Sequence, residues 1–121
     1  MKKVFNILSL FLVILALAAC EYATIIPDTP SPDVPVSFKT EIQPYFTANC
    51  VKCHTNGGPM PNLIEGKAYQ SLISNTLVIA GDAANSKLYT EIITGGGMAG
   101  FSDAKSNGLV KNWINQGAKD N

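Results

Sequence analysis

The sequence predicts a small all-α domain. Apolar residues recur at helical spacing in four segments between residues 38 and 117. No convincing strand is present apart from a short apolar run at residues 76–80. The part of the chain with a globular composition, residues 37–121, is long enough for one small domain.

The first two helices are expected before residue 75. The first covers residues 38–49 and contains Pro44, which is expected to start a turn or kink the segment. The second covers residues 66–74. Their apolar faces consist of Phe38, Ile42, Tyr45 and Phe46 in the first and of Tyr69, Leu72 and Ile73 in the second.

Two further helices are expected in the second half of the domain. One follows a turn at residues 81–85 and is capped by Asn85 or Ser86. The last begins with Ser102 as its N-cap and ends at Gly117. Gly108 inside this helix costs up to about 1 kcal/mol relative to alanine, so it is either a tolerated surface position, which we favour, or a point of close contact. Their apolar faces consist of Leu88, Tyr89, Ile92 and Ile93 and of Leu109, Val110, Trp113 and Ile114.

Residues 1–19 have the pattern of an export signal. Lys2 and Lys3 precede an apolar run, which ends in Leu17-Ala18-Ala19-Cys20. This ending resembles a bacterial lipobox and predicts a lipoprotein signal peptide at 1–19 with lipidation of Cys20. Ordinary secretory cleavage near Ala19 or a retained membrane anchor are the alternatives. The chain is therefore expected to be exported and lipid-anchored in the cell envelope, on the periplasmic side or at the outer membrane.

Residues 20–36 predict a spacer between this anchor and the domain. Four prolines among polar residues favour an extended chain and cannot build a core. The predicted organisation is thus a signal peptide at 1–19, a Pro-rich tether at 20–36 and a domain at 37–121. Removal of the signal peptide leaves seven lysines against nine acidic residues, a formal net charge of −2. Without a basic patch, nucleic-acid binding is not expected.

The motif Cys50-Val51-Lys52-Cys53-His54 carries the predicted chemistry. Two thiols at this spacing can form thioethers with the two vinyl groups of one haem, and the histidine that follows can ligate its iron. The motif therefore predicts one covalently bound haem c, attached through Cys50 and Cys53, with His54 as the proximal axial ligand. A zinc site and a redox dithiol are the alternatives. Zinc would need a fourth ligand, for which no second histidine exists, and a dithiol normally belongs to a βαβ pattern.

A second axial ligand is expected from a methionine. Met98 follows Gly95-Gly96-Gly97, whose backbone can approach a porphyrin closely, and is the preferred distal ligand of the haem iron. Met60 lies only six residues after His54 between two prolines, so it is less well placed. Either methionine can instead fill a gap in an apolar pocket. The second nitrogen of His54 is expected to donate to a backbone carbonyl of residues 57–61.

Several short segments resemble a known family when taken in order. They are Glu41-Ile42-Gln43-Pro44-Tyr45-Phe46, residues 50–54, Gly81-Asp82 with Asn85-Ser86-Lys87-Leu88-Tyr89, residues 95–98, and Ser102-Asp103-Ala104 with Trp113-Ile114 and Gly117-Ala118. With them the chain resembles small class I-type cytochrome c domains of the lipid-anchored kind found in Bacteroidota and Planctomycetota. The resemblance implies a helical domain wrapped around one haem, with Cys50 and Cys53 as thioether sites and His54 and Met98 as iron ligands. Ala99-Gly100-Phe101 stands where that family usually has prolines.

The predicted function is that of a membrane-tethered, mono-haem electron carrier. It would exchange single electrons with redox partner proteins of the cell envelope through transient docking, without enzymatic activity. The alternative is a haem-based sensor or a domain that binds a gas or another small molecule, in which the loop of Met98 opens. Peroxidase chemistry is disfavoured because no second histidine is present to serve as an acid or base.

Overall fold

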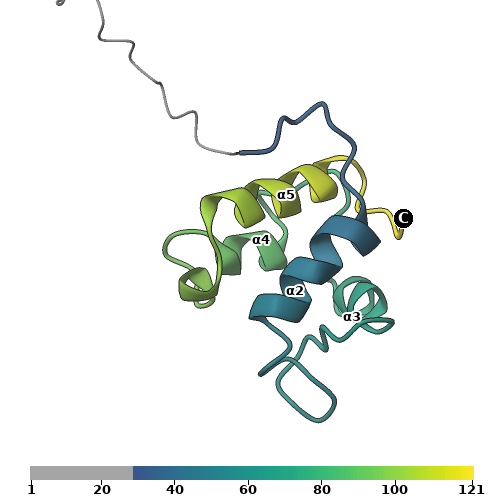
Figure 1. Cartoon of the computed structure of the whole chain (residues 1–121), viewed down its shortest axis with the longest axis vertical. Coiled ribbons are helices and arrows are strands. Elements are labelled where there is room, and N and C mark those ends of the chain that lie inside the picture. Colours follow the sequence, from purple (N-terminus) through teal and green to yellow (C-terminus); the bar gives the residue numbers. More distant parts are fainter. Residues whose placement is uncertain (1–28) are drawn as a thin grey trace, which may run out of the picture.

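The computed structural model describes residues 29–121 and consists of helices joined by loops (Figure 1). The predicted signal peptide, Cys20 and the first part of the predicted tether lie outside the described residues. The elements in order are η1 (Phe38–Ile42, a π-helical turn), α2 (Gln43–Asn49), α3 (Ala68–Ser74), α4 (Lys87–Ile92), η2 (Ala99–Phe101, a 3-10 turn) and α5 (Ala104–Asn115). Residues 29–121 contain no strand, so the predicted all-α class is confirmed and residues 76–80 are irregular. In the same range, no helix is long and apolar enough to span a membrane.

The first predicted helix exists but changes geometry near Pro44. The Ser37 hydroxyl accepts a hydrogen bond from the Thr40 amide at its start. In η1 the Ile42 amide bonds to the carbonyl of Ser37, five residues earlier, at 3.3 Å. Pro44 lies in the first turn of α2, where its missing N–H is tolerated. The expected kink is therefore a π-helical turn that leads into a regular α-helix.

The start of α5 differs from the prediction by one residue. Asp103, not Ser102, is the N-cap, and its carboxylate accepts the Ser106 amide at 2.7 Å. This hydrogen bond lowers the pKa of Asp103. The Ser102 hydroxyl is instead hydrogen-bonded to the Asn107 side-chain oxygen at 2.6 Å. The end is as predicted, because Gly117 follows the helix with a φ of 101°.

The two shorter helices also differ from the prediction in detail. α3 begins at Ala68, two residues later than expected. Of the two candidate caps of α4, Ser86 occupies the N-cap position, but its buried side chain does not cap the helix. Its hydroxyl accepts the Ile79 amide at 2.8 Å and donates to the Asp82 carbonyl at 2.7 Å. Ser86 thus ties the preceding loop to the helix start.

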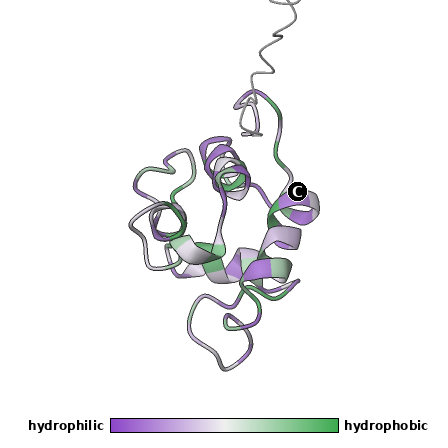
Figure 2. Cartoon of the chain, turned by 60° about the vertical axis from the view of Figure 1, so that its left-hand side comes forward, coloured by the Kyte–Doolittle hydropathy of each residue, from purple (hydrophilic) through white to green (hydrophobic). Residues whose placement is uncertain are grey.

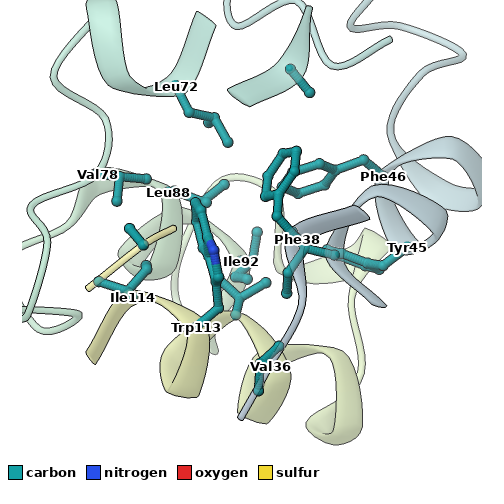
Figure 3. Close-up of a cluster of buried hydrophobic side chains, with 14 of the residues drawn as sticks. Val36, Phe38, Tyr45, Phe46, Leu72, Val78, Leu88, Ile92, Trp113 and Ile114 are labelled. Carbon is teal, nitrogen blue, oxygen red and sulfur yellow. The ribbon is translucent and has the colours of Figure 1, made fainter. Parts of the chain in front are cut away.

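An aromatic cluster joins η1, α2, α3 and α5 in the core. Figure 3 shows its members Phe38, Phe46 and Trp113. The Phe38 ring centroid lies 5.1 Å from Trp113, 5.4 Å from Tyr69 and 6.2 Å from Phe46. Such distances are typical of favourable aromatic pairs. Trp113 is only 1 % exposed, which confirms the prediction that it is a core residue, and its indole N–H donates to the Lys119 carbonyl at 2.9 Å. The cluster holds α2, and with it the residues that follow α2, against the last helix.

Residues 30–36, which we call the strap, lie along α5. The Asn112 side-chain amide donates to the carbonyl of Pro30 at 3.0 Å. The Gln116 side chain accepts the Val36 amide at 2.8 Å, and Val36 itself is buried. Residues 30–36 of the predicted tether are therefore part of the folded domain.

Gly108 has a packing role, so its interpretation as a tolerated surface position is wrong. A Cβ atom at this position would lie 2.8 Å from Cδ of Pro30. The absence of a side chain allows the strap to lie directly on α5. The sequence did not reveal this contact because Pro30 is far from Gly108 along the chain.

Replacing Gly108 with alanine separates helix propensity from packing. Propensity alone predicts stabilisation by up to about 1 kcal/mol. Because the new Cβ would displace the strap, we expect Gly108→Ala to lower the free energy of unfolding in urea by about 1 kcal/mol. Hydrogen exchange of the Val36 amide should become faster. In a Pro30→Gly background the same substitution should be neutral or stabilising, and a stabilised Gly108→Ala single variant would contradict the contact.

Candidate haem-attachment site

The motif residues continue α2 by one helical turn. The amides of Cys53 and His54 both donate to the carbonyl of Cys50, at 3.2 and 2.9 Å. The two cysteines and the histidine thus lie in one hydrogen-bonded turn that directly follows α2. Cys50 is half-buried, Cys53 is exposed, and both are free thiols. Gly58 packs on the Cys53 carbonyl so closely that a Cβ there would collide with it.

A closed loop orients the imidazole of His54. The Leu63 amide donates to the His54 carbonyl at 2.9 Å and closes the loop. Nδ1 of the ring lies 3.1 Å from the Pro61 carbonyl and 3.2 Å from the Pro59 carbonyl. Since carbonyl oxygens only accept, Nδ1 carries the hydrogen, and in the neutral imidazole Nε2 then presents its lone pair. The loop thus supplies the backbone carbonyls that were expected from residues 57–61.

Two polar residues whose roles the sequence does not reveal attach this loop to the helices, and a third polar contact lies within the loop. The buried Gln43 of α2 donates from its side-chain amide to the Leu63 carbonyl at 3.0 Å. Ser71 of α3 accepts the Asn62 amide at 2.9 Å. The Asn62 side chain bonds in turn to that of Asn56 at 2.7 Å. None of these residues is of a type that marks a haem site, so only the folded chain reveals their role.

The two candidate distal methionines lie on different segments. Met60 belongs to the same loop that holds the His54 ring and is 59 % exposed. Met98 is 40 % exposed and is the N-cap of the turn η2, whose Phe101 amide donates to the Met98 carbonyl at 3.0 Å. Ser102, the residue after η2, faces the Tyr45 hydroxyl, which also faces the Cys50 thiol. Ser102, four residues after Met98, therefore lies near the motif through Tyr45.

Tyr45 holds a buried hydroxyl between these two segments. The oxygen has no hydrogen-bond partner of regular geometry among residues 29–121, although the side chains of Ser102 and Cys50 face it. Burial raises the pKa of Tyr45 to about 12, and Ser102 opposes this shift. Burial also raises the pKa of Cys50, opposed by Tyr45. Redox-active thiols have lowered pKa values, so the environment of Cys50 does not favour the dithiol alternative.

The zinc alternative gains no support from the geometry. Among residues 29–121, no three histidine, cysteine, aspartate or glutamate side chains converge on a point where they could hold a metal ion.

Comparison with protein-family models, with curated proteins and with solved structures found no match. The resemblance to class I-type cytochromes c therefore stays a prediction, and the chemistry of the site has to be argued from its residues.

The raised pKa of Tyr45 predicts a pH dependence of stability. The unfolded chain loses the phenol proton near pH 10 and the folded chain near pH 12. The contribution of Tyr45 to the free energy of unfolding is thus complete below about pH 10. It is lost as pH rises toward 12, by up to about 1.4 kcal/mol per pH unit. Urea unfolding between pH 9 and 12 should show this loss in the wild type but not in Tyr45→Phe. Parallel curves for the two proteins would contradict the assignment.

Proposed function

We propose that residues 37–121 form a mono-haem c-type cytochrome domain that carries single electrons and is tethered to a membrane through Cys20. Cys50 and Cys53 would form the two thioether bonds, and His54 and Met98 would ligate the iron. When bound, the haem supplies the redox chemistry, in which iron alternates between Fe(II) and Fe(III). The protein itself would catalyse no reaction.

The single observation that carries this proposal is the orientation of the His54 ring. Its Nδ1 is hydrogen-bonded to two backbone carbonyls, so Nε2 is the nitrogen left to ligate a metal. The histidine directly follows Cys53, and both Cys50 and Cys53 are free thiols. Histidines that ligate metals usually donate their other ring nitrogen in this way, which fixes the tautomer and strengthens the ligand. Neither a structural dithiol nor an incidental histidine requires this arrangement.

Exposed apolar side chains in the segment of Met98 fit a covering group. Met98 and Phe101 are 40 % and 59 % exposed, and Phe101 precedes Ser102, which meets Cys50 at the Tyr45 hydroxyl. Apolar groups gathered at a chemically equipped site are typical of a ligand surface. A porphyrin bound at Cys50 and Cys53 has the apolar faces needed to cover such side chains.

The position of the motif within the domain suits contact with a redox partner. The loop that follows the motif lies at the lower end of the domain in Figure 1, whereas the strap lies at the upper end. Figure 2, turned about the same vertical axis, keeps the two at opposite ends. A chain anchored through its N-terminal segment would therefore present the motif away from the point where the tether enters the domain, toward transiently docking partners.

Carbon monoxide binding tests the electron-carrier function. After expression with haem-attachment machinery, the reduced protein should show a six-coordinate, low-spin spectrum that carbon monoxide leaves unchanged. Met98→Ala should open the distal position and allow carbon monoxide to bind. Met60→Ala is the matched control and should behave as the wild type. Ready binding by the wild type would favour the sensor function, and an unchanged spectrum of Met98→Ala would exclude Met98 as a ligand.

A further inference from the structure

One residue of α4 holds the backbone immediately before Met98. The Glu91 carbonyl accepts the Met98 amide at 2.8 Å. The Glu91 carboxylate also accepts the Gly97 amide, at 3.0 Å from Oε2. Two successive amides of the Met98 segment are thus bound by one residue, once through its main chain and once through its side chain.

The glycines before Met98 make this contact possible. At Gly96, a Cβ atom would collide with the carbonyls of Thr90 and Glu91. At Gly97, it would lie 2.9 Å from Oε2 of Glu91. Only a backbone without side chains can approach the end of α4 this closely. The glycine run therefore serves contact with Glu91, a role that its sequence alone does not reveal.

The place of Glu91 in α4 is unusual for a carboxylate. It is the residue before Ile92, at which the helix ends, and negative charge is disfavoured at a helix C-terminus. The last carbonyls of a helix also need donors from outside the helix. Both needs are met here, because the Gly97 amide donates to the Glu91 carboxylate and the Met98 amide donates to the Glu91 carbonyl.

We propose that Glu91 is a positioning residue for Met98. By holding the two amides, it keeps the segment from opening and so keeps the Met98 sulfur available to the iron instead of an external ligand. This inference rests on the proposed function, because it concerns Met98 as the distal ligand. With Glu91 in place, Met98 stays on the iron and the domain acts as an electron carrier. Without it, we expect the iron to become accessible to small molecules.

Imidazole binding to the ferric holoprotein tests this role. Glu91→Ala removes the charged acceptor of the Gly97 amide, so imidazole should replace Met98 about tenfold faster than in the wild type, or more. Glu91→Gln keeps an acceptor oxygen at the same place and should stay within about threefold of the wild type. Equal rates for the wild type and Glu91→Ala would overturn the proposal.

Hydrogen exchange of the Gly97 amide gives a second readout that does not depend on iron ligation. It should accelerate in Glu91→Ala and remain near the wild-type rate in Glu91→Gln. Two glycines of the same segment provide matched controls. Gly96→Ala should raise the imidazole rate as Glu91→Ala does, whereas Gly100→Ala should not, because nothing lies within 4 Å of its Cβ position. A similar effect of both glycine substitutions would refute a specific role of Glu91.

The variants distinguish failure of this inference from failure of the proposed function. If no variant and no wild-type protein carries haem, the proposed function is wrong and the role of Glu91 is wrong with it. If Met98→Ala binds imidazole no faster than the wild type, Met98 is not the ligand. The role of Glu91 is then refuted together with the assignment of Met98, whereas haem attachment at Cys50, Cys53 and His54 stands. If Met98→Ala binds imidazole faster than the wild type and Glu91→Ala does not, only the role of Glu91 is refuted.

Discussion

The fixed orientation of the His54 ring is the constraint on which the candidate site depends. A histidine on a surface turn can rotate and can carry its hydrogen on either nitrogen. Here the carbonyls of Pro59 and Pro61 hold Nδ1, and the Leu63 amide closes the loop that carries them. Each of these bonds contributes only about 1 kcal/mol net. Together they select one tautomer and one ring direction, which is what axial ligation of a metal requires.

This loop can hold the ring only because the helices on either side of it are fixed. Gln43 connects the loop to α2, and the aromatic cluster around Phe38 connects α2 to Trp113 in α5. The strap adds a further layer over α5 and buries Val36. A domain of this size has a small core. The packing that stabilises the fold and the packing that positions the motif are therefore the same, and a bound haem would add apolar contact to both.

Much of the fold follows from periodicity, because each helix is a local feature with one apolar face. The apolar faces of residues 38–49 and of α5 are examples, and their main members are buried as predicted: Phe38, Ile42, Tyr45 and Phe46 in the first and Val110, Trp113 and Ile114 in the second. The errors have two causes, which are contacts between distant residues and competition between neighbouring residues that suit the same role. Gly108 is unfavourable by helix propensity alone, and only its contact with Pro30 explains why a residue without a side chain is needed there. The cap of α5 moved from Ser102 to Asp103 because both residue types can cap and Ser102 has another partner in Asn107.

The same division applies to the site. The residues at 50–54 are contiguous, so the sequence alone predicts haem attachment there. The following loop also predicts a carbonyl partner for His54, and the structure contains one. The roles of Gln43 and Glu91 were not foreseen, since each acts on a segment that lies elsewhere in the chain. A polar side chain that binds a backbone amide or carbonyl has no sequence pattern of its own.

The most direct test of covalent haem attachment is the intact mass of the chain purified after expression with haem-attachment machinery. The account predicts a mass increased by one haem, located by peptide mapping in the fragment that contains Cys50 and Cys53 and absent when both are replaced by alanine. A colourless protein whose mass is that of the polypeptide alone, with both thiols still free, would contradict it.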